Sequence, residues 1–149
     1  MSMETISYNG LPLAIVLPSS FSEKGIHFFT PDSFSQQLGY MNREKGYCIQ
    51  PHDHNPIVRS VEWTQEVLFI RSGKVRLDLY APESRQYLES RILRQGDIVL
   101  LAHGGHGLVM LEETEIIEVK QGPYTGQADK ERFEQITDDR VTFAKTSDG

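Results

Sequence analysis

Three histidines and one glutamate have the residue types and spacing of a metal site. His52 and His54 are two positions apart, so on an extended strand both rings project from the same face. Glu66 follows, and His106 closes the glycine-flanked turn His103-Gly104-Gly105-His106-Gly107. Three neutral imidazoles and one carboxylate suit a single divalent transition metal ion such as Zn, Ni, Mn or Fe. The sequence therefore predicts a mononuclear metal site at His52, His54, Glu66 and His106.

The position of Glu66 supports this prediction. The runs Val67–Arg71 and Lys74–Tyr80 flank Ser72-Gly73, a pattern typical of a hairpin with a two-residue turn. In such a hairpin one face carries apolar side chains with Glu66 at its far end, and the other face is the wetter one. The apolar set is Leu68, Ile70, Val75, Leu77 and Leu79. A carboxylate directed into an apolar interior is costly unless a cation or a hydrogen bond compensates it.

Some assignments around the site stay open. His103 is the alternative to His106, although His106 continues into Leu108 and Met110 on one strand face. An HxH pair taken alone is more often solvated than metal-bound. The inward Glu66 and the third histidine, His106, make metal binding the favoured reading. Cys48 shares the histidine face and is interpreted as a small core residue.

Substrate contacts are predicted at Arg43, Gln50 and Lys120. A divalent ion with one anionic ligand keeps a net positive charge, which favours ligands with several oxygen atoms. The strand Glu115–Lys120 has two readings: either Ile117 and Val119 face the core, or the register is reversed and Glu118 and Lys120 line the pocket. The insertion between His54 and Glu66 is either a lid with Arg59 and Trp63 over a ligand or an ordinary connection.

The rest of the chain indicates an all-β protein. Thr5–Tyr8 and Leu11–Leu17 flank Asn9-Gly10, a strong hairpin signal. A second hairpin is expected around Glu44-Lys45-Gly46, with a strand at Tyr47–His54. Further strands are predicted at Tyr87–Leu93, Ile98–Leu101 and Leu108–Leu111, and helix only in short pieces, for example around Asp129–Ile136.

Composition narrows the class of protein. The 149 residues carry a net charge of −6, which argues against nucleic acid or an anionic membrane as partner. A single cysteine, the lack of an apolar run long enough to span a bilayer and an N-terminus without signal-peptide features predict a cytoplasmic protein.

Four apolar residues are expected on the outer face of the strands: Tyr47, Ile49, Val67 and Phe69. Such residues need a cover, which predicts a homodimer.

Two stretches of the chain resemble the cupin motifs. The run Gly46-x5-His52-x-His54-x11-Glu66-x6-Gly73 is similar to the first motif, with a longer stretch before the glutamate, and Gly96 to His106 is similar to the second. In the second stretch Ala102 replaces the usual proline and His106 comes one position early. The resemblance covers about Tyr40 to Lys120. It implies a jelly-roll barrel (a double-stranded β-helix), commonly dimeric, with a metal ion in the barrel mouth.

On this reading residues 1–149 form one cupin domain. Its barrel core is expected at about 37–120, with extra N-terminal strands in 1–36 and a polar tail in 126–149, of which Thr137 to Gly149 are expected to be frayed. The resemblance extends to small cupins that occur with sugar and polysaccharide biosynthesis proteins, which implies a role in carbohydrate metabolism.

Two classes of function follow. One is a metal-dependent isomerase, oxygenase or lyase that acts on a sugar, a sugar acid or a related hydroxy or oxo acid. The other is a metal-bearing module that binds or senses a small molecule without turnover, because a fold does not fix a function. Glu118 and His103 are the only candidates for a general base.

Overall fold

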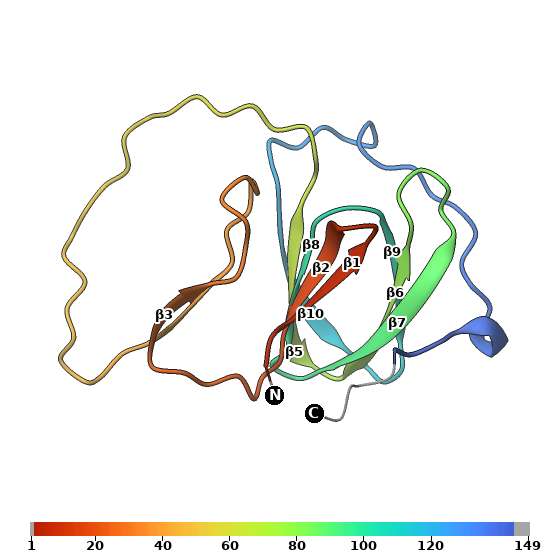
Figure 1. Cartoon of the computed structure of the whole chain (residues 1–149), viewed down its shortest axis with the longest axis horizontal. Helices are drawn as coiled ribbons and strands as arrows, with labels where there is room; N and C mark the ends of the chain where they lie inside the picture. Colours follow the sequence, from red (N-terminus) through yellow and green to blue (C-terminus); the bar gives the residue numbers. More distant parts are fainter. Residues whose placement is uncertain (1, 145–149) are drawn as a thin grey trace.

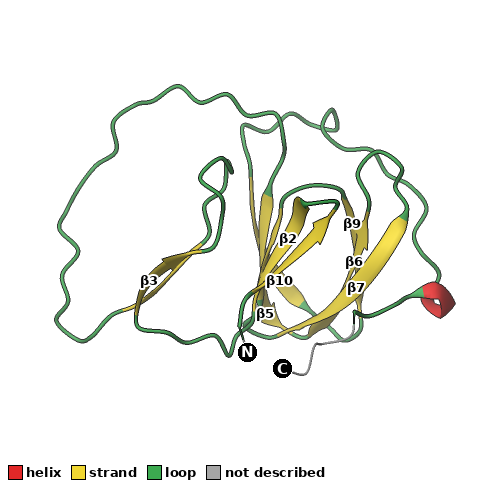
Figure 2. Ribbon diagram, viewed as in Figure 1, coloured by secondary structure: helices red, strands yellow, loops and turns green. Residues whose placement is uncertain are grey.

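The computed structural model describes residues 2–144, which form strands joined by turns and irregular segments (Figure 2). No α-helix occurs within these residues, and a single 3₁₀ turn lies at Asp138–Arg140. No helix among them is long and apolar enough to cross a membrane. The strands are β1 Glu4–Tyr8, β2 Leu11–Leu17, β3 Gly25–Phe28, β4 Gly39–Asn42, β5 Glu66–Ser72, β6 Lys74–Tyr80, β7 Tyr87–Arg94, β8 Ile98–Leu101, β9 Gly105–Met110 and β10 Glu115–Lys120.

All strand pairs are antiparallel, and the strands form three sheets (Figure 1). The five-stranded sheet has the order β1-β2-β8-β5-β10, the three-stranded sheet the order β7-β6-β9, and β3 pairs with β4. The two larger sheets enclose the main core, whose buried members are Ile6, Ala14, Val16, Leu68, Ile70, Val75, Leu77, Leu79, Leu93, Val99 and Leu101. The prediction of an all-β protein is confirmed. The described strands form an open sandwich and do not close into a barrel.

The first hairpin forms as the sequence predicts. Tyr8 pairs with Leu11, so Asn9 and Gly10 make a two-residue turn, with φ of 49° and 79°. Asparagine and glycine tolerate positive φ better than other residues, and a turn of this type matches the twist of the two strands. β2 then lies inside the five-stranded sheet, between β1 and β8.

The hairpin expected at Ser72-Gly73 is wrong, because β5 and β6 belong to different sheets. Gly73 is a corner at which the chain crosses the sandwich, with φ of 92°. A Cβ atom there would collide with the backbone carbonyl of Glu113, so only glycine fits without a shift. The predicted apolar face is nevertheless correct, since all five of its residues lie in the main core.

The outer faces of both sheets are covered in part by the chain itself. On the five-stranded sheet, Phe29, Phe34 and Leu38 pack with Ile15 and Leu100 in a second apolar cluster that also includes the predicted outer residue Val67. The segment between β3 and β4 therefore lies over this face.

On the three-stranded sheet, the face expected to be the wetter one holds a buried ion pair. The Arg76 Nε atom donates to Asp78 Oδ1 at 2.8 Å, and both side chains are almost fully buried. Burial of this face is possible because the C-terminal segment crosses it.

The C-terminal segment is ordered up to residue 144, so the prediction of a frayed tail is wrong there; residues 145–149 lie outside the described part. Arg76 Nη1 donates to Asp138 Oδ1 at 3.0 Å, and the Ser90 N–H donates to the Thr142 carbonyl at 2.8 Å. The helix expected at Asp129–Ile136 does not form. Two apolar residues of this segment instead contact Tyr80. The ring of Phe133 packs against the ring of Tyr80, and the backbone N–H of Ile136 donates to the Tyr80 hydroxyl.

The strand expected at Tyr47–His54 does not form either. Tyr47 N–H donates to Glu44 O at 3.1 Å, so the turn is present, but β4 pairs with β3 and no hairpin follows. Residues 43–63, which we call the arm, have no regular structure and are all exposed. Figure 1 shows the arm as a wide excursion from β4 to β5. A strand needs a neighbour for its hydrogen bonds, and the described chain brings none to this segment.

Candidate functional site

Glu66 and His106 meet at one open edge of the sandwich. Glu66 is the first residue of β5, and its side chain is only 12% exposed; His106 lies near the start of β9 and is 33% exposed. The His106 Nε2 atom is 3.5 Å from Glu66 Oε2. The pair thus joins the two sheets at the place where a ligand could approach from solvent.

Strand register explains why both side chains point inward. Glu66 pairs with Leu101, and His106 pairs with Leu79, and both partners lie in the main core. Residues that face each other on neighbouring antiparallel strands project to the same side of the sheet. The predicted inward orientation of Glu66 and the continuation of His106 into Leu108 on one face agree with these registers.

β10 places two further charged residues on this inner face. Lys120 pairs with Glu66 and Glu118 pairs with Leu68, whereas Ile117 and Val119 are on the outer side and exposed. The expectation that Ile117 and Val119 face the core is wrong. The reversed register holds because β10 is an edge strand whose outer side has no covering layer, so its apolar residues tolerate either face.

The charges of the cluster influence one another. A hydrogen bond from His106 is the main cause that lowers the pKa of Glu66; burial opposes it, and the positive charges of His106 and Lys120 assist. Glu118 has its pKa raised, first by partial burial of its carboxyl group and then by the negative charge of Glu66. Glu66 is therefore held as a carboxylate, the form that accepts a cation, beside a second carboxyl group with a weaker tendency to ionise.

The other two predicted ligands lie elsewhere. His52 and His54 are on the exposed arm, with ring centroids 5.3 Å apart, and His52 Nδ1 is 2.9 Å from the Gln50 carbonyl. Across residues 2–144 no group of three or more His, Cys, Asp or Glu side chains is arranged to hold a metal ion. Within one chain the predicted set is thus divided into two halves, Glu66 with His106 and His52 with His54.

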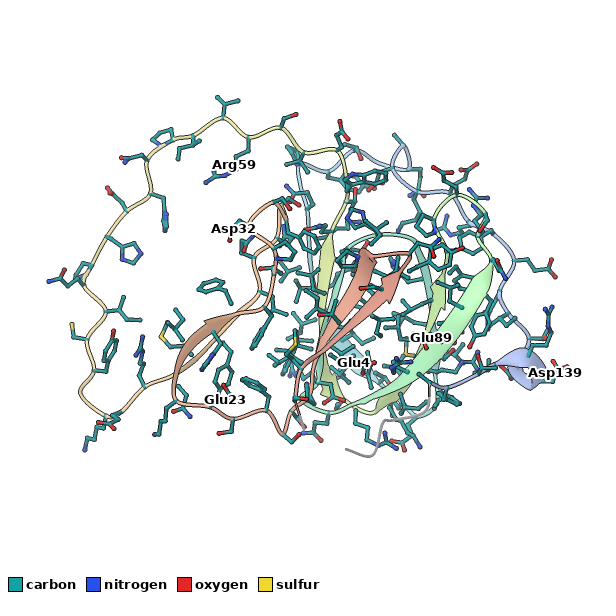
Figure 3. The ribbon with its side chains drawn as sticks, in the orientation of Figure 1. Glu4, Glu23, Asp32, Arg59, Glu89 and Asp139 are labelled. Atoms are coloured by element: carbon teal, nitrogen blue, oxygen red, sulfur yellow. The ribbon has the colours of Figure 1, made fainter. Side chains whose placement is uncertain are left out.

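A cleft of about 900 Å³ lies between the end of the arm and the segment that follows β10. Lys120 lines it, together with Arg59 and Trp63 of the arm and Tyr124. Figure 3 shows Arg59 on the arm's inner side, facing the segment that carries Asp32. Because Lys120 also pairs with Glu66, the cleft adjoins the histidine–carboxylate pair.

The remaining candidates have clear positions. Arg43 and Gln50 are exposed on the arm and do not line the cleft; the Arg43 guanidinium stacks on Tyr47 at 4.4 Å. Cys48 is exposed, so its interpretation as a core residue is wrong. His103 contacts the rings of Phe34 and Trp63, with centroids 5.9 and 5.4 Å away, and burial lowers its pKa.

Tyr124 and Phe34 also line the cleft, and the sequence did not single them out as site residues. Nothing in their local pattern distinguishes them from other loop aromatics. The only available signal was the glycine–proline turn before Tyr124, which marks a loop but not its neighbours.

Comparison of the chain with protein-family models, characterised proteins and solved structures found no match. The fold and the site therefore define the class of protein by themselves. It is an antiparallel β-sandwich with a histidine–carboxylate pair at an open edge and a mixed aromatic and cationic cleft beside that pair.

Proposed function

We propose that this protein is a metal-binding cupin that acts on a small, oxygen-rich molecule. Glu66 and His106 bind one divalent transition metal ion, His52 and His54 complete the ligand set, and the ligand occupies the cleft beside Lys120. The observation that carries the proposal is the inward, mostly buried Glu66 carboxylate, 3.5 Å from the Nε2 atom of a histidine on the opposite sheet.

The order of the strands supports a jelly roll. From β5 to β10 the chain visits the five-stranded sheet, then the three-stranded sheet twice, and then alternates between the two. Repeated crossing between two packed antiparallel sheets is the arrangement of double-sheet jelly rolls. β9, which carries His106, is an edge strand of the three-stranded sheet, and a further strand beside it would complete the barrel.

The chemistry of the donors supports a metal ion, although one chain does not bring all four together. Two or three imidazoles with a carboxylate suit Zn, Ni, Mn or Fe. A buried carboxylate requires compensating partners; His106 and Lys120 supply part of this compensation, and a bound metal ion would supply the rest.

The cleft supports a ligand of the sugar or sugar-acid type. Trp63 and Tyr124 are exposed and offer flat apolar surfaces to the faces of a sugar ring. Arg59 and Lys120 supply cationic donors for hydroxyl or carboxylate oxygens. In the reaction these residues would hold the substrate with its oxygens toward the histidine–carboxylate pair, and Trp63 would exclude water from one side.

Elemental analysis of protein purified without added metal tests the first half of the proposal. We expect close to one equivalent of a transition metal per chain in the wild type, and much less in Glu66→Gln and in His52→Ala. Gln36→Leu is a matched control that should keep its metal, because the Gln36 side chain is hydrogen-bonded to Gln121 and not to any proposed ligand. A metal-free wild type under reconstitution with all four candidate ions would contradict the proposal.

Thermal-shift screening with sugars, sugar acids and 2-oxo acids tests the second half. We expect stabilisation that disappears with chelator and that is weakened in Lys120→Met more than in Arg43→Met, because only Lys120 lines the cleft. Turnover of a stabilising compound then identifies an enzyme, and stabilisation without turnover identifies a binding or sensor module. Stabilisation only by apolar compounds, or shifts that chelator does not change, would count against the proposed ligand class.

A further inference from the structure

The sandwich has an uncovered edge beside the site. β9 and β10 each pair with a neighbour on one side only in the described chain. Leu108 and Ile116 are only partly buried at the edge of the main core, and Met110, which pairs with core residue Val75, is 48% exposed. Free strand edges next to apolar side chains are normally covered, since they otherwise promote aggregation.

The arm, in contrast, has exposed apolar side chains but pairs with no sheet of the described chain. Tyr47, Ile49, Ile57 and Val58 are all exposed on it. The arm meets the rest of its own chain near its end, where Trp63 packs on His103. Long irregular segments with this apolar content are unusual inside a compact domain unless they have a partner.

The arm and the uncovered edge fit each other. In residues 47–54, an extended conformation puts Tyr47 and Ile49 on one side and His52 and His54 on the other. Paired with the free edge of β9, the histidine side would join the inner face that carries His106. Pro51, which lacks an N–H, is acceptable because the added strand is itself an edge strand.

The path of the arm indicates that the sheet it joins belongs to a second copy. The segment between β3 and β4 packs on the outer face of the five-stranded sheet, so the arm begins on the side away from the three-stranded sheet. Figure 1 shows β3 on one side of the sandwich and β9 on the other, and the arm swings outward from the β3 side. The arm also has about the number of residues, roughly 20–30, that one side of a standard interface contributes.

We propose that two copies of this chain exchange their arms, and that residues 47–54 of each copy pair with β9 of the other. His52 and His54 of one copy then complete the Glu66–His106 site of its partner, so neither site is complete in a single chain. The inference rests on the proposed metal site for its ligands, but the exchange itself can be tested without metal.

Complementation between two defective variants tests the shared site. One variant is His52→Ala/His54→Ala, defective in the arm, and the other is Glu66→Gln/His106→Ala, defective in the sandwich. Each alone should bind almost no metal. In a mixed dimer with exchanged arms, one of the two sites receives an intact arm on an intact sandwich. After co-expression and random pairing, about a quarter of the wild-type metal content should return. If the wild type binds metal and the mixture binds none, the ligands come from one chain and the exchange of ligands is wrong, whereas the metal site stands.

Cross-linking at Cys48, the only cysteine, tests the exchange independently of metal. Labelled with a photoreactive maleimide and irradiated, the full chain should give a covalent dimer of twice the 17.0 kDa monomer mass. The matched control is Cys48→Ser/Ser7→Cys, which moves the label to an exposed position on β1, at the opposite edge of the sandwich from β9 and β10, and should leave the chain monomeric on a denaturing gel. Cross-links confined to single chains in the Cys48 protein, or equal dimer yields at both positions, would overturn the proposal even if the metal site is real. Cross-linked dimer in a protein that binds no metal would support the exchange and refute the proposed function alone.

Discussion

The Nε2 atom of His106 lies 3.5 Å from a carboxylate oxygen of Glu66, although the two residues belong to opposite sheets. Both side chains point inward because their strand partners, Leu79 and Leu101, lie in the main core. At the other edge of the sandwich, Arg91 and Glu4 make a corresponding link between β7 and β1. That edge is closed by an ion pair, whereas the His106 edge has room for a further ligand.

The geometry of His106 makes it, and not His103, the expected third histidine ligand. His106→Ala should lose most of the bound metal, because it removes the imidazole beside Glu66. His103→Ala should retain it, because the His103 ring packs between Phe34 and Trp63. Metal content by elemental analysis after identical purification checks this. Retention in His106→Ala with loss in His103→Ala would reverse the assignment.

Most of the sandwich could be predicted from the sequence, since its strands alternate clearly and end at turn residues. Ile98–Leu101 and Glu115–Lys120 have the predicted bounds, and the Asn9-Gly10 hairpin forms with the expected turn. The corner at Gly73 could not be predicted. A glycine with positive φ serves equally in a tight hairpin and in a crossing between sheets, and only the packing of Glu113 and Thr114 against it distinguishes them.

For the candidate site, the direction of a side chain could be predicted only where its strand faces the core. Glu66 and His106 face a strongly apolar core, so periodicity determines their direction. Glu118 and Lys120 lie on an edge strand, where the alternation of Ile117 and Val119 gives the wrong face. The arm shows the limit most clearly: residues 47–54 alternate as a strand does, but pairing depends on a neighbour that no local pattern specifies.

The buried Arg76–Asp78 pair should be important for stability. Arg76→Met leaves the Asp78 carboxylate buried without its partner, which we expect to lower the free energy of unfolding by about 3–5 kcal/mol. Asp138→Asn is the control, since Asp138 is 83% exposed and its loss should cost about 1 kcal/mol or less. Urea unfolding measures both. The double variant Arg76→Met/Asp78→Leu should be more stable than Arg76→Met alone, and an additive loss would contradict the role of the unpaired charge.

Gly73 should tolerate substitution less well than Gly10. Gly10→Ala should lower the stability by about 1–2 kcal/mol through its positive φ alone, because no atom lies within 4 Å of the added Cβ. Gly73→Ala pays a similar conformational cost and also brings the Cβ within 2.7 Å of the Thr114 Cα, as well as against the Glu113 carbonyl. Thermal unfolding of the two variants should therefore show the larger loss at position 73. Equal losses would mean that the crossing between the sheets relaxes easily.

The stability of the protein should fall in mildly acidic solution partly because of His103. Burial lowers the pKa of His103 below its ordinary value of 6.5, so the unfolded chain binds the proton more tightly than the folded one. As the pH falls below 6.5, protonation favours the unfolded state, and the loss of stability continues until the pH passes the lowered pKa of the folded protein. His103 lines a second, smaller cleft, and Glu62 is the charged residue beside it there; the negative charge of Glu62 favours the protonated ring and opposes the effect of burial.

His103→Gln removes this proton linkage while keeping a polar side chain. Urea unfolding between pH 7.5 and 5 should therefore show a flatter pH dependence in His103→Gln than in the wild type, and His27→Gln, at the separate β3–β4 hairpin, serves as the histidine control. Parallel curves for wild type and His103→Gln would show that His103 binds its proton equally well in the folded and unfolded chains.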